Sequence, residues 1–139
     1  MCVICYKARG KKLPDETTMR RMWETNPDGA GVMWKNDEGL VNYRKGFMKF
    51  KDVLDFVREN HNLLEGTECA IHFRIGTHGG KTPGNTHPFV ARDGADPFVL
   101  GGTGESYVLM HNGVLPIEPR RVDISDTAEL ALRAGEFER

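Results

Sequence analysis

The stretch that most constrains the fold is a short amphipathic segment near the middle of the chain. Its apolar residues recur at positions i, i+3, i+4 and i+7, with charged residues on the opposite side. These apolar residues are Phe50, Val53, Leu54 and Val57. The spacing predicts a helix with one buried face. The flanking segments instead predict a β-hairpin over residues 30–45 and a strand over residues 67–75, so the centre of the chain is expected to combine a helix with strands.

Two more elements are predicted before this centre, and a long loop follows it. Residues 2–6 are β-branched, aromatic or cysteine and predict a first strand, while residues 17–24 predict a short helix. Residues 76–105 hold eight of the sixteen glycines. Such a loop inside a small domain is usually functional or mobile.

The C-terminal third is predicted to contain a hairpin and a helix. Residues 107–111 predict a strand, Asn112-Gly113 a tight turn, and Val114-Leu115 the start of the return strand. Residues 128–133 predict a helix with Asp126 as its N-cap.

Composition excludes several classes of protein. The 139 residues fit a single domain, and the formal net charge of −1 provides no general attraction to nucleic acid or to an anionic membrane. Three cysteines, an odd number, argue against a disulfide framework and for a reducing compartment. The sequence shows neither a signal peptide nor an apolar run of about 20 residues. We therefore expect a cytoplasmic protein, without a cofactor and with an undetermined oligomeric state.

Cys2 is a candidate nucleophile because of its position. If Met1 is removed, Cys2 carries a free α-amine, whose pKa of about 7.7–8.0 suits a general base near neutral pH. One residue would then supply both nucleophile and base, as in N-terminal nucleophile enzymes. By itself, Cys2 is equally compatible with a small buried apolar residue.

Other residues could complete such a site. Arg74 ends a predicted strand before a glycine-rich loop, and a guanidinium can hold a carboxylate at two points. Asn112 and the N–H of Gly113 could form an oxyanion hole, although Asn-Gly is also the commonest hairpin dipeptide. Asp126 could hold an ammonium group or only cap a helix.

Several motifs occur along the chain in a characteristic order. They are Met1-Cys2, His72-Phe73-Arg74-Ile75-Gly76-Thr77, Asn85-Thr86-His87-Pro88-Phe89, His111-Asn112-Gly113 and Ser125-Asp126-Thr127. This order resembles that of the class II glutamine amidotransferases, a family of N-terminal nucleophile (Ntn) hydrolases. The segment Asn26-Pro27-Asp28-Gly29-Ala30-Gly31 resembles the family's glycine-rich turn near the nucleophile.

The resemblance implies an α+β fold in which stacked antiparallel β-sheets are flanked by helices (αββα). It implies one glutamine amidotransferase type 2-like domain over residues 1–139. The family's domain continues further past the Ser-Asp-Thr motif than this sequence does, so the fold is expected to be incomplete at its C-terminus. Two family residues are replaced, by Val3 after the nucleophile and by Ala128 after the Ser-Asp-Thr motif.

The resemblance also implies the catalytic roles. Cys2 would attack the side-chain amide of glutamine and form a thioester, while Asn112 and the Gly113 N–H would stabilise the oxyanion. Water would then hydrolyse the thioester to glutamate. Retention of Met1 would block this chemistry.

The implied substrate is L-glutamine. Arg74 and Thr77 would bind its α-carboxylate, Asp126 would bind its α-ammonium, and the loop after Gly76 would close as a lid. The ammonia would pass to an acceptor held by a synthase partner subunit or would simply be released.

Three alternatives remain open at this point. The pairs Cys2/Cys5 and Cys69/His72 give a Cys3His set that could bind zinc, although strand alternation would separate the members of each pair. An Ntn cysteine hydrolase could instead cleave another N-acyl amide, such as a bile-salt conjugate or a penicillin. A catalytically silent Ntn-fold protein could act in binding. The remaining histidines are expected to be structural, so no metal site is predicted.

Overall fold

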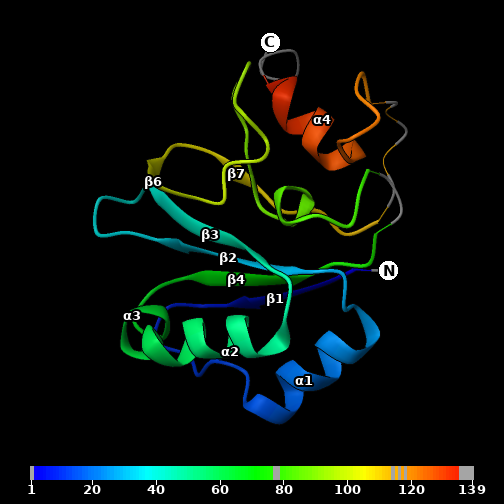
Figure 1. Cartoon of the computed structure of the whole chain (residues 1–139). Helices are drawn as coiled ribbons and strands as arrows, with labels where there is room; N and C mark the ends of the chain where they lie inside the picture. The colour runs from blue at the N-terminus through cyan, green and yellow to red at the C-terminus, as the bar shows by residue number, and fades with distance from the viewer. Residues whose placement is uncertain (1, 77–78, 114, 116, 118, 135–139) are drawn as a thin grey trace.

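The computed structural model describes residues 2–76, 79–113, 115, 117 and 119–134. Its elements lie in layers (Figure 1). Helices α1, α2 and α3 cover one face of a five-stranded sheet, and a two-stranded sheet with helix α4 lies over the other face.

The five-stranded sheet is antiparallel throughout. Its strands, in spatial order, are β1 (Val3–Lys7), β4 (Cys69–Phe73), β2 (Ala30–Lys35), β3 (Val41–Phe47) and β6 (Gly101–Glu105). The predicted hairpin corresponds to β2 and β3, and the predicted strands at 2–6 and 67–75 correspond to β1 and β4. These predictions are confirmed.

The helical layer consists of α1 (Glu16–Thr25), α2 (Phe50–Glu59) and α3 (His61–Glu65). Helix α2 buries Val53, Leu54 and Val57, as its apolar stripe predicts. The side chain of Asp15 caps α1 by accepting a hydrogen bond from the N–H of Thr18 at 2.8 Å. Both predicted helices in this half of the chain are confirmed, and they form one core with the sheet.

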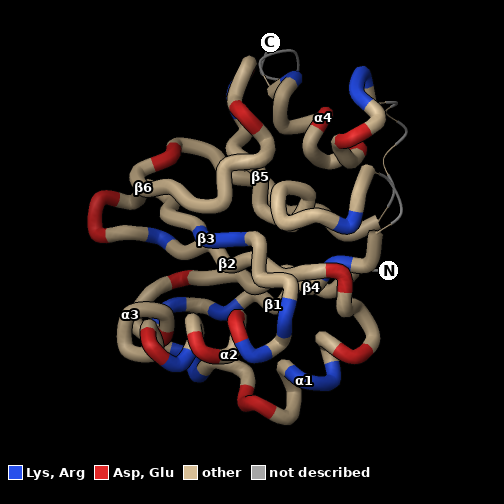
Figure 2. The backbone as a smooth tube through the Cα atoms, viewed as in Figure 1, with Lys and Arg blue, Asp and Glu red and all other residues tan. Residues whose placement is uncertain are grey.

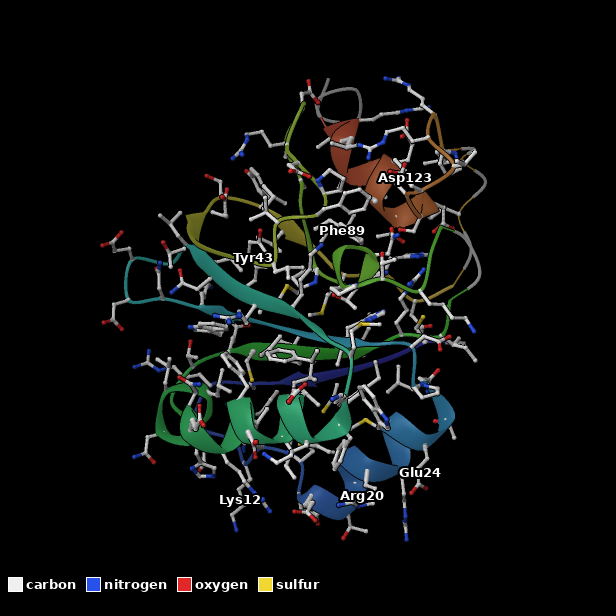
Figure 3. All side chains as sticks on the ribbon, in the orientation of Figure 1. Lys12, Arg20, Glu24, Tyr43, Phe89 and Asp123 are labelled. Carbon is white, nitrogen blue, oxygen red and sulfur yellow. The ribbon has the colours of Figure 1, made fainter. Side chains whose placement is uncertain are left out.

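The second layer has a core of its own. It contains β5 (Phe89–Val90), β7 (Val108–Leu109), the 3-10 helix η1 (Pro83–Asn85) and α4 (Asp126–Leu132). Phe89 packs with Ile124, Ala128 and Ala131 there. In Figure 3, Phe89 and Tyr43 lie between the large sheet and α4, whereas Lys12 and Arg20 lie at the outer, helical side. The α+β class is therefore confirmed, and the layer order is compatible with an Ntn-hydrolase-like fold.

Two predictions in the second half of the chain are wrong. Residues 76–105 are not one loop, because β5, β6 and η1 lie within them. Strand β6 is rich in glycine because it lies close against Tyr43 of β3. A Cβ on Gly102 would lie 2.8 Å from the ring of Tyr43.

The predicted hairpin around Asn112-Gly113 is also wrong. Strand β7 is only two residues long and pairs with β5, far back in the sequence. The described residues after Gly113, up to Ser125, contain no strand. Val114 lies outside the described residues. Pairing with the distant β5 thus replaces the local pairing that the Asn-Gly dipeptide favours.

Basic and acidic residues alternate over the outer helices (Figure 2). Several form ion pairs, among them Arg20 with Glu16 at 3.1 Å and Lys51 with Asp55 at 2.6 Å. Such exposed pairs contribute little to stability. In the part of the chain that the structure describes, no helix has the length and apolar character needed to span a bilayer.

Candidate active site

Cys2 lies at the edge of the sheet, immediately before β1. The register pairs Val3 with Phe73, so Cys2 faces the residues that follow β4. The N–H of Ile75 donates a hydrogen bond to the Sγ of Cys2 at 3.3 Å, and the thiol donates to the carbonyl of Ile75 at 3.6 Å. The backbone after β4 therefore holds the half-buried thiol in place.

The other two cysteines lie on the helical side of the sheet. Cys5 and Cys69 pack in the core beneath the helices, and burial raises the pKa of both thiols, that of Cys69 to about 11. Because the thiolate is the reactive form, these two are poor nucleophiles near neutral pH. Cys2 is thus the cysteine whose thiol lies outside the helical core, against the backbone of Ile75.

The alternation of side chains along the strands also argues against the zinc alternative. Cys5 and Cys69 lie on the opposite face of the sheet from His72, whose ring stacks on His87 in the upper layer. Among the residues that the structure describes, no group of three or more His, Cys, Asp or Glu side chains could hold a metal ion. The structure therefore does not bring the four residues of the Cys3His alternative together.

Arg74 follows β4 directly and is only 2% exposed. Its Nη1 donates a hydrogen bond to the carbonyl of Gly80 at 2.8 Å. Burial lowers the pKa of the guanidinium, and the nearby Cys2, Asp28 and Asp126 act in the opposite direction. Backbone hydrogen bonds thus bring the Cys2 thiol and the Asp28 carboxylate to the two residues that follow Arg74, and the Asp126 carboxylate acts on the pKa of Arg74 from α4.

Asp28 was not among the predicted site residues. Its backbone N–H donates to the carbonyl of Arg74 at 2.8 Å, and its carboxylate accepts from the N–H of Gly76 at 2.8 Å. Lys81 lies 3.5 Å from the same oxygen. The Asn-Pro-Asp-Gly sequence around Asp28 predicts a turn. That turn packs tightly: a Cβ on Gly29 would lie 2.4 Å from Thr86. The turn motif was therefore the available signal, but it does not indicate which strand end the turn contacts.

Asp126 occupies the first turn of α4 and is not its N-cap, contrary to the prediction. Ser125 is the cap, and its Oγ accepts from the N–H of Ala128 at 3.1 Å. Asp126 is 4% exposed and accepts from the N–H of Leu115 at 2.7 Å and from that of Thr127 at 2.7 Å. Ser125 therefore takes the capping role, and the Asp126 carboxylate acts to raise the pKa of Arg74.

Asn112 and Gly113 are connected to the site through histidines. Gly113 has a φ of 120°, which glycine adopts readily, and Asn112 is exposed. The carbonyl of the preceding His111 lies 3.0 Å from the Nε2 of His72. His72 is two residues before Arg74, or about 6–7 Å along an extended chain. Thr77 and Met1, the remaining residues of the predicted site chemistry, lie outside the described residues.

Comparison with known proteins gives one distant relative and no family match. No family model matches the chain. Over 117 residues, or 84% of the chain, it is 27% identical to a glutamine–fructose-6-phosphate aminotransferase (isomerizing) from Leifsonia xyli subsp. xyli (strain CTCB07). The chain spans only 19% of that relative's length. The similarity supports at most a relationship to glutamine-using amidotransferases.

Proposed function

We propose that the protein hydrolyses the side-chain amide of L-glutamine through a thioester on Cys2, as a class II amidotransferase-like enzyme. The observation that carries this proposal is the position of the Cys2 thiol beside the buried Arg74, with Asp28 and Asp126 in the same electrostatic environment. The distant similarity to an enzyme whose name includes glutamine supports the same substrate.

The buried charges suit a zwitterionic amino acid. Arg74 would bind the α-carboxylate, since a planar guanidinium can hold a carboxylate at two points. Asp126, together with Asp28, would bind the α-ammonium. Thr77 is proposed to assist at the carboxylate. The amide at the far end of the substrate would then reach Cys2.

The proposed chemistry begins with a free N-terminus at Cys2. Its α-amine takes the thiol proton as Sγ attacks the amide carbon, and the new S–C bond gives a tetrahedral intermediate. The C–N bond then breaks and the amine returns the proton, so that ammonia leaves and a γ-glutamyl thioester remains. Water hydrolyses the thioester, which releases glutamate and restores the thiol.

Asn112 and the backbone N–H of Gly113 are proposed to stabilise the negative oxygen of both tetrahedral intermediates. Such donors act where charge develops in the transition state, and loss of one typically costs about 100- to 1,000-fold in kcat. The ammonia acceptor is proposed to belong to a synthase partner or to another part of the polypeptide. Residues 1–139 would then be the glutamine amidotransferase type 2-like domain.

The main rival on the same fold is hydrolysis of another N-acyl amide. An apolar acyl group gains most from an apolar pocket. The residues proposed to bind the substrate instead include the buried charged side chains of Arg74 and Asp126, which are 2% and 4% exposed. A lining of buried charged groups suits a substrate that itself carries charges better than it suits an apolar acyl group.

The test combines intact mass with an ammonia-release assay. Protein that has lost Met1 should release ammonia from glutamine, and Cys2→Ala should abolish the release. Cys5→Ala is the matched control, because Cys5 is also half-buried but lies on the helical face; its activity should stay close to wild type. Processed wild-type protein that releases no ammonia from glutamine would overturn the proposal.

A second measurement tests the substrate orientation. Arg74→Lys keeps the charge but loses two-point binding, so the KM for glutamine should rise about 10- to 100-fold, the equivalent of one hydrogen bond to a charged group. The exposed Arg44→Lys is the control. An unchanged KM in Arg74→Lys would remove Arg74 from the substrate site.

A further inference from the structure

Two histidine rings are stacked between the two sheets beside the proposed site. His72 comes from β4 and His87 from the segment between η1 and β5, and they are 0% and 4% exposed. Their ring centroids are 3.8 Å apart and their planes differ by 2°. The proposed reaction uses neither ring.

Together the two rings hold both polar backbone groups of His111. The carbonyl of His111 lies 3.0 Å from the Nε2 of His72, and its N–H donates to the Nδ1 of His87 at 3.2 Å. A carbonyl can only accept, so the Nε2 of His72 must carry a proton. The Nδ1 of His87 accepts, so it must be unprotonated. These two hydrogen bonds assign a tautomer to each ring.

The surroundings keep both rings neutral. Burial lowers the pKa of His72 to about 4 and that of His87 well below its usual value, and the cationic Arg74 lowers the pKa of both rings further. Lys45 acts on His87 in the same direction. The Nδ1 of His72 is buried without a hydrogen-bond partner among the described residues. An unprotonated Nδ1 fits that position better than an added buried donor would.

The rings can lie this close to the sheet because of a glycine. A Cβ on Gly31 would lie only 1.6 Å from the carbonyl oxygen of His87. Gly113, two residues after His111, has its positive φ beside the His111 ring, with a virtual Cβ 3.5 Å from Cε1. The pair of rings therefore fixes the peptide groups that lead into Asn112-Gly113.

We infer that His72 and His87 are positioning residues that hold the backbone of His111 and thereby aim the Asn112-Gly113 turn at the oxyanion. This inference rests on the proposed function. Neither ring touches the substrate in this role. Each acts through the peptide groups of His111, whose orientation decides where the next N–H groups point.

The kinetic test compares two substitutions at the same position. His87→Leu removes the acceptor, whereas His87→Asn places an amide oxygen close to where Nδ1 lies. Misplacement of catalytic groups by about 1 Å can cost about 100-fold. We expect His87→Leu to lower kcat about 10- to 100-fold with little change in KM, and His87→Asn to recover most of the loss. The pair His72→Leu and His72→Gln should behave alike, since the Gln amide supplies a donor near Nε2.

Two kinetic outcomes would overturn the inference. One is an unchanged kcat in both Leu variants. The other is an equal loss of kcat and thermal stability in the Leu and amide variants, which would mean that the rings serve only the fold.

A spectroscopic measurement separates this inference from the proposed function. In 15N-labelled wild-type protein, the backbone nitrogen of His111 should show a through-hydrogen-bond coupling to the Nδ1 of His87. Absence of that coupling would refute the positioning contact whatever the activity. If the coupling is present but processed protein releases no ammonia from glutamine, the proposed function fails, and the catalytic part of this inference fails with it.

Discussion

Replacing Gly31 by alanine tests the packing of the two sheets most directly. Gly31 lies in β2, and an ideal Cβ there would lie 1.6 Å from the carbonyl oxygen of His87 and 2.9 Å from the Cβ of Lys45. Real Cβ contacts essentially never fall below 3.0 Å, so the His87 carbonyl would have to retreat by at least about 1.4 Å. The nearest obstacle is backbone, which cannot rotate away as a flexible side chain can.

The expected cost follows from that displacement. Overpacking costs about 1–3 kcal/mol. A retreat of this size also breaks the 3.2 Å hydrogen bond from the His111 N–H to His87, which is worth about 0.5–1.5 kcal/mol. Alanine recovers about 0.5–1 kcal/mol of chain entropy relative to glycine in a strand. Gly31→Ala should therefore lower the free energy of unfolding by about 0.5–4 kcal/mol.

Urea denaturation followed by tryptophan fluorescence measures this change. Gly101→Ala is a suitable control, because Gly101 is also a strand glycine but its nearest neighbours, on Arg44 and Tyr43, are 3.3 Å from an ideal Cβ. We expect the control to change stability by less than about 1 kcal/mol. The reasoning is refuted if Gly31→Ala is as stable as both wild type and the control.

Three further predictions concern the cap of α4, the buried lysine and the thiols. Ser125→Ala should lower the free energy of unfolding by about 1 kcal/mol in urea denaturation, because α4 loses its side-chain cap; no loss would remove the capping role. Burial lowers the pKa of Lys45 from 10.5 to about 7. Between those values the unfolded chain binds a proton that the folded protein has released, so wild type should gain stability relative to Lys45→Met as pH rises through this window. A difference between the two proteins that does not vary with pH would contradict this assignment. At mildly alkaline pH, peptide mass spectrometry should find a thiol reagent on Cys2 before Cys5 or Cys69, and earlier labelling of Cys69 would contradict the placement of the three thiols.

Elements with a strong local signal could be predicted from the sequence. The apolar stripe of α2 and the turn between β2 and β3 depend on neighbouring residues alone, and both predictions are confirmed. Strand β6 could not be found this way, because Gly101–Glu105 becomes a strand only by pairing with β3. The prediction of a hairpin at Asn112-Gly113 is wrong for a related reason. Its local signal favours pairing with the segment that follows, whereas β7 pairs with the distant β5.

The residues of the candidate site could be predicted from the sequence only in part. The order of the motifs groups Cys2, Arg74 and Asp126, and in the structure Cys2 and Asp126 both act on the pKa of Arg74. The sequence around Asp28 predicts only a turn, and the contacts of that turn with the residues after β4 depend on the tertiary fold. The roles of His72 and His87 depend on two chain segments that meet across the sheets, which no local pattern reveals.

Strand β4 links the core and the site through its alternation. Ile71 and Phe73 face the helices, while His72 faces the upper layer and Arg74 follows in the same phase. Deleting one residue before β4, with the strand ends kept in place, would exchange these two sets of side chains. The guanidinium of Arg74 would then point into the helical core, the phenyl ring of Phe73 would take the place of the His72 ring, and Ile75 would take the place of Arg74 near Cys2. The number of residues between α3 and Arg74 is therefore as strict a requirement for the site as the identity of Arg74 itself.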